Sequence, residues 1–469
     1  MRLSHDLPKT HASFDDPNLV SRAGLVPVMA LAEKAGLSDL VGEHLSTGGP
    51  CGVNAHLKVG CLVAGMAAGA DSIDDLDVLR HGAMSDLFAG IRAPSTLGSF
   101  LRSFTWGNVR QLDAVARRVL AGLAREAPLL PGSEVLAFID IDATQKRVYG
   151  HAKQGAGVGH TKIAGKTVLV RGLNALAAVV STPLAAPVIA ATRLRGGSAN
   201  SARGAASLAR EAISAARQAG CSGQLAVRID SAYHSAKMLG AIRSAGAYFS
   251  VTVPLRRDVR AVVEAIPEDA WTPITYPRAI WDEDQQRLVS GAQVAEVPYT
   301  AFAKKKKGSA ITARLIVRRV RDLNPKASQG QGELFTAWRY HAVFTDSPFE
   351  MIQAEEHHRD HAIIEQVFAD WNDGPLAHLP SGHFPANAAW LTLAAITANL
   401  TRAAGVLASP FHARARGATI RAGLITVAAR IARHGRGHLT LHLPEGWHHQ
   451  AGWMNLFEPA CGSPLPAAA

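Results

Sequence analysis

The segment from Val135 to Thr144 constrains the fold most, because an apolar run there carries two carboxylates. The run is typical of a buried β-strand that presents charge at its end, at Asp140 and Asp142. Side chains alternate along a strand, so these two aspartates share one face. A second apolar run, starting at Gln224, ends in the same way at Asp230. Strands that alternate with helices of the intervening length predict an α/β sheet with parallel members, whose functional groups gather at the carboxyl ends of strands.

Composition and charge narrow the class of protein. The chain has 469 residues, a formal net charge of +11 and a pI of about 9.7. Such a basic excess favours polyanionic partners, chiefly nucleic acid, with a generally basic proteome as the alternative. An uninterrupted apolar run of membrane-spanning length and a signal-peptide pattern are both missing, so we expect no membrane segment and a cytoplasmic protein. The four scattered cysteines indicate reduced thiols rather than a disulfide scaffold or a zinc site.

Changes of pattern along the chain predict five regions. Residues 1–128 are helical, and short capped helices with arginines in 94–125 suit a helix-turn-helix-like DNA-binding unit, although a plain helical bundle fits equally well. Strands and helices alternate over 129–253. Short strands without helical periodicity over 254–347 indicate a β-rich insertion. A helical pattern returns over 348–410, with residues 351–370 expected to form one helix, and 411–469 is a basic tail.

Basic residues concentrate in two places beside these elements. Within the insertion they are Lys304, Lys305, Lys306, Lys307, Arg318 and Arg319. Four consecutive lysines form either a solvated loop or a phosphate-contact site, and the charge of the whole chain favours DNA contact. The glycine-rich stretch 150–165 is also basic, but it lacks the pattern of an ATP-binding P-loop, so we expect a loop beside nucleic acid.

Three acidic residues stand out in strand, strand, helix order: Asp142, Asp230 and Glu365. Each alone could be a surface or capping residue. Together they suit two-metal phosphoryl transfer, in which carboxylates hold two Mg²⁺ ions and the ions relieve the mutual repulsion of the acids. A rival is a helical zinc site formed by His357, His361 and Glu365 at i, i+4 and i+8, although the HExxH pattern is absent.

With these residues in place, the chain resembles a DDE transposase of bacterial insertion sequences, most closely the insertion sequence thirteen-eighty family. The resemblance covers nearly the whole chain, least securely residues 1–90. It rests on the motifs Asp140-Ile-Asp-Ala-Thr144, Val227-Arg-Ile-Asp-Ser-Ala-Tyr233, Arg359-Asp-His-Ala-Ile-Ile-Glu-Gln366, Leu376-Ala-His-Leu-Pro-Ser-Gly382, Ala386-Asn-Ala-Ala-Trp-Leu391 and Asn399-Leu-Thr-Arg402.

The resemblance implies an RNase H-like catalytic core, interrupted by the β-rich insertion between the second Asp and the Glu. It places the first Asp on Asp142, because the related pattern is Asp-x-Thr, with Asp140 as the runner-up. Asp230 and Glu365 complete the metal-binding set, and Arg359 and His361 become candidate DNA contacts. Related enzymes often carry Tyr-x-x-Arg-x-x-x-Glu, with a Lys seven residues after the Glu. This chain departs from that pattern with His358, His361 and Asn372.

The implied activity is cut-and-paste transposition. Mg²⁺, or Mn²⁺ in its place, would support hydrolysis that frees 3′-OH ends and their attack on target DNA. The implied partners are double-stranded DNA at terminal inverted repeats, target DNA, and a second copy of the chain on the paired ends, in a bacterial nucleoid. The alternatives are a degenerate transposase or a DNA-binding regulator that binds ends without cleaving them.

Overall fold

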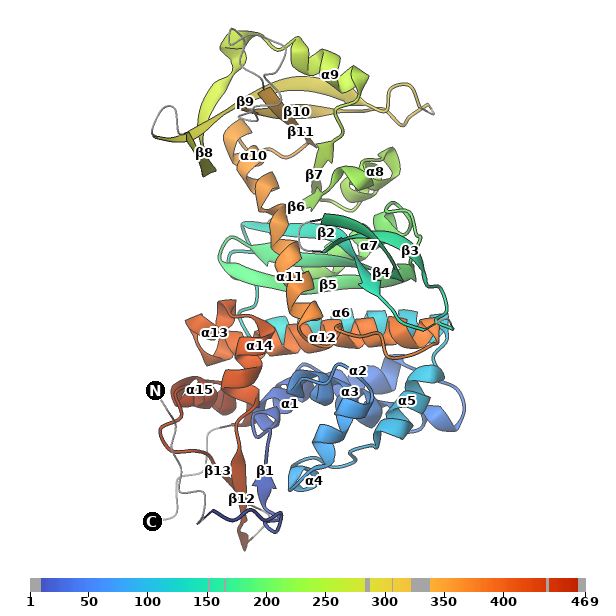
Figure 1. Ribbon diagram of the computed structural model, residues 1–469, viewed down its shortest axis with the longest axis vertical. Helices are drawn as coiled ribbons and strands as arrows, with labels where there is room; N and C mark the ends of the chain where they lie inside the picture. The colour runs from blue at the N-terminus through green and yellow to red at the C-terminus, as the bar shows by residue number, and fades with distance from the viewer. Residues whose placement is uncertain are drawn as a thin grey trace.

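A large mixed sheet forms the centre of the molecule (Figure 1). The computed structural model describes residues 10–150, 152–163, 166–282, 287–305, 307–321, 338–435 and 438–462. The central strands are β2 (Leu136–Arg147), β4 (Lys166–Thr182), β5 (Ala185–Gly196), β6 (Gln224–Ile229) and β7 (Tyr248–Val253). They lie in the order β5-β4-β2-β6-β7; β2, β6 and β7 run parallel, and β4 is antiparallel to β2 and β5. The predicted α/β class with parallel members is confirmed.

The segment predicted as a β-rich insertion continues this same sheet. Its strands are β8 (Thr272–Asp282), β9 (Arg287–Ala301), β10 (Ile311–Arg321) and β11 (Trp338–Thr345), after helix α9 (Arg257–Glu264). Strand β11 pairs antiparallel with β7, and β10, β9 and β8 follow outward. The segment therefore adds strands to the edge at β7.

One expected loop is a strand. Residues 150–165 contain β3 (Gly157–Ile163), which pairs with the first half of β4. Glycines permit this arrangement, because a Cβ on Gly159 would lie 2.6 Å from the carbonyl oxygen of Gly197, and a Cβ on Gly157 would lie 2.9 Å from the backbone nitrogen of Ser198. The glycines that suggested a loop instead allow three backbone segments to pack closely.

The predicted helix 351–370 is two helices. Helix α10 (Met351–Arg359) ends in a 3₁₀ turn, η6 (Asp360–Ala362), and α11 (Ile363–Asn372) follows. Helix α11 packs on β2 and β5 and crosses the sheet in Figure 1. The tighter turn coincides with a hydrogen bond from His361, inside the turn, to Asp140 on β2, so a tertiary contact accompanies the departure from a continuous helix.

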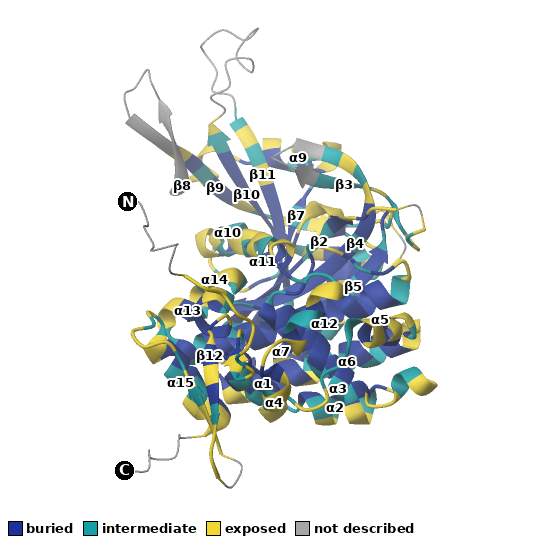
Figure 2. Ribbon diagram, turned by 60° about the horizontal axis from the view of Figure 1, so that its bottom comes forward, coloured by how far each residue is buried: buried dark blue, intermediate teal, exposed yellow. Residues whose placement is uncertain are grey.

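Helices form a second layer beside β5, and Figure 2 shows their buried faces in dark blue. The N-terminal helices are α1 (Leu25–Lys34), α2 (Leu37–His44), α3 (Ala55–Ala68), α4 (Met84–Leu87), α5 (Pro94–Arg102) and α6 (Trp106–Glu126). They pack around α12 (Phe384–Ala408), while α7 (Ala205–Gln218) and α8 (Ala236–Ser244) follow β5 and β6. Helix α12 is long and apolar enough to cross a membrane, but 78% of its most apolar window is buried inside the protein. It is the central helix of the core.

The predicted basic tail is folded against the N-terminal helices. It contains α13 (Pro410–Arg414), α14 (Gly417–Ile420), the π-turn η7 (Arg421–Ile425), β12 (Ala429–Arg433), β13 (Leu439–His442) and α15 (Gln450–Cys461). Strand β12 pairs with β1 (Leu19–Val20), and α15 packs on α1 and α12. Segments near both ends of the chain therefore share a small sheet, visible at the bottom of Figure 1.

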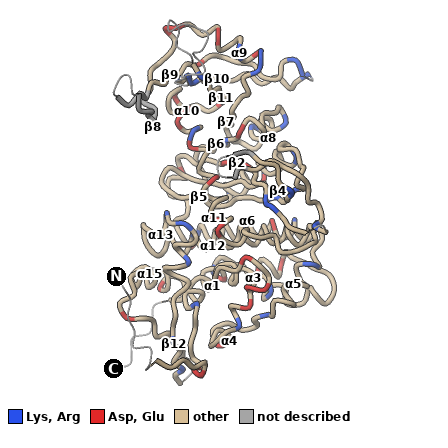
Figure 3. Tube along the Cα trace, in the orientation of Figure 1, with Lys and Arg blue, Asp and Glu red and all other residues tan. Residues whose placement is uncertain are grey.

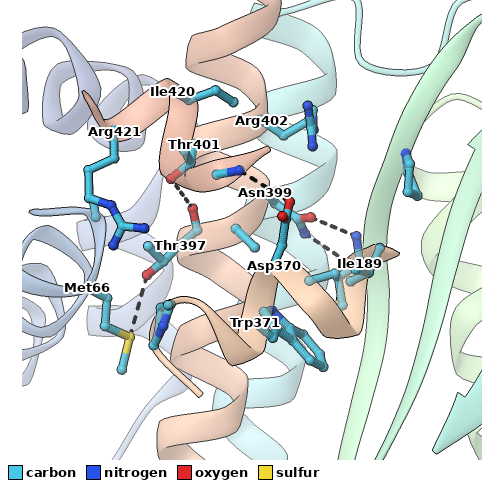
Figure 4. A pocket seen from close by; sticks show the side chains of 17 residues that line it. Met66, Ile189, Asp370, Trp371, Thr397, Asn399, Thr401, Arg402, Ile420 and Arg421 are labelled. Atoms are coloured by element: carbon cyan, nitrogen blue, oxygen red, sulfur yellow. Dashed lines mark hydrogen bonds between the residues drawn. The ribbon is translucent and has the colours of Figure 1, made fainter. Parts of the chain in front are cut away.

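A buried side chain joins α12 to an irregularity in β5. The register between β4 and β5 shifts so that Ala190 is skipped. There the carboxamide of Asn399 accepts a hydrogen bond from the backbone N–H of Ile189 (2.7 Å) and donates one to its carbonyl oxygen (2.8 Å), as Figure 4 shows. Asn399 thus satisfies both backbone groups of a residue beside the bulge.

We expect Asn399→Ala to lower the free energy of unfolding by about 3 kcal/mol, because both backbone groups of Ile189 would be left buried and unpaired. The matched control is Thr401→Ala, whose hydroxyl donates to the carbonyl of Thr397 in its own helix, so its loss should cost about 1 kcal/mol. Urea unfolding measures both, and equal losses would contradict the assigned role of Asn399.

Candidate active site

Two of the predicted carboxylates meet where β6 ends beside β2. The parallel register pairs Ile141 of β2 with Ile229 of β6. Asp142 and Asp230 are the next residues along these two neighbouring segments. Strand β6 stops at Ile229, whereas β2 continues to Arg147. Asp230 is therefore on a turn, with its side chain 57% exposed, while Asp142 lies within a strand.

Helix α11 brings the third carboxylate, Glu365, to the same place. Glu365 lies in the first turn of the helix and is exposed. The pocket that contains all three carboxylates is lined by Asp142, Asp230, Thr252, Arg318, His341, Ala342, Val343, Glu355, His358, Arg359, His361, Ala362, Ile364 and Glu365. The predicted set is therefore brought together from β2, the end of β6 and α11.

Asp140 has a different environment from Asp142. Its side chain is fully buried and accepts two hydrogen bonds from Arg228, at 2.7 and 2.6 Å, and a third contact comes from Nδ1 of His361 at 2.8 Å. Burial alone would raise the pKa of Asp140, but Arg228 and His361 outweigh it and lower that pKa below its usual value. Asp140 is thus the counter-ion of two cations and has no free oxygen directed at the pocket.

Asp142 shows the opposite shift. Burial, together with the nearby charges of Asp230 and Glu365, raises its pKa to about 6, although the backbone N–H of Ala143 and the charge of His361 oppose that shift. A cation among the three carboxylates would relieve this repulsion, and carboxylate oxygens suit Mg²⁺. Within the described residues, no three His, Cys, Asp or Glu side chains are already grouped closely enough to hold a metal ion. The donor chemistry fits a divalent cation, and the side chains would have to converge on it.

His361 links the buried pair to the pocket. Burial alone would lower its pKa, but Asp140, with the charges of Asp230 and Asp142, raises it. Its Nε2 lies 3.9 Å from Oδ1 of Asp230. The ring therefore favours the protonated form beside the carboxylates, where an N–H can face a phosphate oxygen.

Besides His361, the other two departures from the related motif, His358 and Asn372, also have structural partners. His358 is buried, and its ring nitrogens lie 2.8 Å from Oγ of Ser250 and 2.9 Å from Oγ1 of Thr252 on β7. Burial lowers its pKa to about 3, so it is a neutral residue that joins α10 to the sheet. Asn372 accepts a hydrogen bond from Lys146 of β2. The position seven residues after Glu365, where related enzymes carry a lysine, is therefore contacted by Lys146 from the strand that carries Asp142.

The zinc alternative is not supported by the arrangement of its residues. The ring of His357 packs at 4.8 Å against both Phe138 and Phe349, and it lines a different pocket from the one with Glu365. His361 is already bonded to Asp140. The helical spacing of the sequence is interrupted by η6, so these histidines and Glu365 do not converge.

The predicted DNA contacts have different environments. Lys304, Lys305 and Lys307 are exposed in the turn between β9 and β10, and Lys306 lies outside the described residues. Arg319 is 3% exposed, lies between the rings of Trp271 (4.3 Å) and Trp338 (4.4 Å), and bonds Glu268. Arg318 and Arg359 both pair with Glu355 in the wall of the pocket. Only the lysines are fully presented to solvent.

Several residues near the site were not predicted from the sequence. Arg228 lies directly opposite Asp140 in the register of β2 and β6, and two residues before Asp230. Tyr233 is buried close to Asp142 and Asp230, which together with burial raise its pKa, and it hydrogen-bonds Arg195. Arg228 had a detectable signal, since a buried strand position with a charge requires a partner.

Substitutions of Asp140 and Asp142 should have opposite effects on the free energy of unfolding. We expect Asp140→Asn to lower the free energy of unfolding by about 3–5 kcal/mol, because Arg228 would stay buried without its counter-ion. Asp142→Asn should instead raise it by about 1 kcal/mol near pH 7.5 without divalent cations, after allowance for solvent screening. The folded-state pKa of Asp142 is raised from 3.8 to about 6, so its contribution to stability is present below the unfolded pKa and is lost as the pH rises through 6.

Urea unfolding at pH 7.5 and at pH 3 measures these effects. The gain from Asp142→Asn should vanish near pH 3, where the wild-type carboxyl is mostly protonated in both the folded and the unfolded state. Equal destabilisation by the two substitutions would contradict the distinct roles given to the two residues.

Comparisons with known proteins place the chain in a family. A search of curated proteins finds no match. Among solved structures, the chain is similar to a piggyBac transposase in a synaptic complex with hairpin DNA, at 10% sequence identity and a TM-score of 0.39 over 87% of this chain and 79% of that chain. The family model of the transposase DDE domain group 1 matches residues 4–459. The chain therefore belongs to the DDE transposase family.

Proposed function

We propose that this protein is the transposase of a bacterial insertion sequence of the thirteen-eighty family, and that it cleaves DNA at inverted-repeat ends and joins those ends to target DNA. The observation that carries the proposal is that Asp142, Asp230 and Glu365 all line one pocket. Family membership supplies the chemistry, phosphodiester cleavage and transfer, for which such carboxylates are suited.

The strand arrangement supports an RNase H-like core. Three antiparallel strands (β5, β4 and β2) are followed by two strands parallel to β2, in the order β5-β4-β2-β6-β7. The acidic residues lie on β2 (Asp142), just after β6 (Asp230) and on helix α11 (Glu365). The segment between β7 and α10 would then be an insertion that extends the core sheet.

Magnesium bound by the three carboxylates would activate water or a 3′-OH and stabilise the leaving oxygen. The surrounding residues have tasks of their own. Arg228 and Asp140 fix the strands that carry Asp142 and Asp230. Protonated His361 would donate to a phosphate oxygen or neutralise part of its charge. Mn²⁺ would serve in place of Mg²⁺, since both accept oxygen ligands.

The remaining assignments concern partners. On α5 and α6, Arg110 and Arg117 pair with Glu211, whereas Arg102 and Arg118 are exposed and are better candidates for contact with duplex DNA. Joining two ends requires two active sites, which favours a homodimer on the paired ends. A cytoplasmic, nucleoid-associated enzyme would meet its DNA without crossing a membrane.

We expect Asp230→Asn and Glu365→Gln each to lower strand cleavage by at least about a thousandfold, because an oxygen ligand of the metal site is lost. Binding to a duplex that carries the inverted repeat should stay within about threefold of wild type. Gel-resolved cleavage and fluorescence anisotropy measure the two properties. The matched control is Glu356→Gln on α10, an exposed carboxylate outside the pocket, which should keep full activity.

Cleavage that survives both substitutions would refute the three-carboxylate assignment. A wild-type chain that binds ends and never cleaves them, with Mg²⁺ or Mn²⁺ present, would favour the degenerate transposase or the regulator.

The pH dependence of the metal requirement is a separate prediction. Because the pKa of Asp142 is about 6 without metal, protons should compete with Mg²⁺ below that pH. The Mg²⁺ concentration for half-maximal cleavage should rise by up to about tenfold per pH unit below 6 and level off above it. Cleavage titrations with Mg²⁺ at several pH values test this, and a requirement that is constant from pH 5 to 8 would contradict it.

A further inference from the structure

The turn between β9 and β10 contains the described residues 302–305 and 307–310, which are here called the lysine loop. It begins at Phe302, whose backbone has a φ of +61°. A bulky residue in this left-handed region costs about 1–2 kcal/mol. The compensating contact is made by the side chain, because the ring of Phe302 lies 4.7 Å from the ring of His234 and packs against the core. The base of the loop is thus held in a defined conformation.

His234 belongs to the segment that begins with Asp230. That segment is the short 3₁₀ turn η4 (Ser231–Tyr233), which has Asp230 as its N-cap residue and His234 as its C-cap residue. The other neighbour of His234 is Phe344 of β11, at 6.4 Å. The imidazole therefore contacts both Phe302 at the base of the lysine loop and a buried ring of the sheet, four residues from a candidate metal ligand.

The surface around this contact is positively charged. Lys304, Lys305 and Lys307 are exposed, and Nζ of Lys305 lies 5.9 Å from the ring of Phe302. Exposed Arg256 approaches His234 from the start of α9, and Asp258 is the nearby acid. In Figure 3 the loop at the end of the β9–β10 hairpin is blue. A row of exposed ammonium groups suits the phosphates of a DNA strand.

We propose that the lysine loop binds DNA phosphates next to the cleavage site. Through the contact of Phe302 with His234, this binding holds the Asp230 turn in the position needed to bind a metal ion. Phe302 is a positioning residue in this scheme. The inference rests on the proposed function and adds a coupling between DNA binding and metal binding.

The coupling has a thermodynamic consequence. If DNA on the lysine loop restricts the Asp230 turn, DNA must raise the affinity for divalent cation, and the cation must raise the affinity for DNA by the same factor. Removal of the Phe302 ring should abolish the part of this mutual increase in affinity that is transmitted through the protein. The lysines should still be able to contact phosphate. DNA phosphates that ligate the ion directly would contribute equally in both variants.

The first experiment tests the loop as a phosphate site. The triple substitution Lys304→Gln, Lys305→Gln and Lys307→Gln should reduce the slope of log affinity against log salt by about 2.7, or 0.9 per lost contact, on a short random-sequence duplex. Fluorescence anisotropy of full-length protein measures the slope. An unchanged slope would overturn the assignment of the loop to DNA.

The second experiment tests the coupling. Free Mn²⁺ is measured by electron paramagnetic resonance during titration of wild type, Phe302→Ala, Phe302→Tyr and Phe411→Ala, each with and without a pre-cleaved duplex that cannot react. In wild type the duplex should raise Mn²⁺ affinity by at least about fivefold, and Phe302→Ala should cut this enhancement to about twofold or less. Phe302→Tyr keeps the ring and should restore it. Phe411→Ala removes a distant Phe–His contact and should leave it unchanged.

An absent enhancement in wild type, or an enhancement that survives in Phe302→Ala, overturns the inference. So does a loss in Phe302→Ala that is accompanied by an equal loss in Phe411→Ala, since general destabilisation would then explain it. These measurements are independent of turnover. If the wild type never cleaves DNA although the enhancement follows the ring of Phe302, the proposed catalytic function fails and the coupling stands.

Discussion

The buried pair of Asp140 and Arg228 is the interaction on which the arrangement of the site depends. Taking two charges out of water costs several kcal/mol each, so such a pair persists only when its hydrogen bonds are satisfied. Here Arg228 bonds both oxygens of Asp140 and the carbonyl of His357, and Asp140 also bonds His361. Each residue of this network is close in sequence to a carboxylate of the pocket. Asp142 is two residues after Asp140, and Asp230 is two residues after Arg228. Glu365 is four residues after His361. One buried network therefore sets the relative positions of β2, β6 and α11.

The same network explains why one strand carries two aspartates with different properties. Strand alternation gives both side chains the same face, but only Asp140 is opposite the guanidinium of Arg228. The cations lower the pKa of Asp140, whereas burial and the neighbouring acids raise that of Asp142. An acid whose charge is already neutralised has little to gain from a metal ion, while one that is repelled by its neighbours has much to gain. This difference in environment is the reason for proposing Asp142, and not Asp140, as a metal ligand, with Asp140 fixing the scaffold.

The sequence predicted what depends on local pattern and left open what depends on contacts between distant residues. Apolar runs located β2, β6 and β7, and their acidic ends located two pocket residues. The choice between Asp140 and Asp142 could only be supported by a motif, because the deciding partner lies 88 residues away on another strand. Residues 351–370 have an unbroken helical pattern, yet the chain tightens at η6, where His361 bonds Asp140. The glycines of 150–165 predicted a loop because glycine is common in turns, and close backbone packing is a second reason for glycine that pattern alone cannot distinguish.

Net charge favoured nucleic acid as the class of partner, but it did not indicate which cations are exposed to solvent. Arg318 and Arg319 are held by Glu355 and by Glu268 with two tryptophan rings, and Arg228 is held by Asp140. The planar guanidinium forms two-point hydrogen bonds and stacks on rings at a lower desolvation cost than an ammonium, so it is the better cation for internal positions. Lysine is strongly hydrated and stays at the surface, as Lys304, Lys305 and Lys307 do. Arg228, Arg318 and Arg319 therefore stabilise the framework, whereas the lysines of the loop keep their charge exposed to solvent.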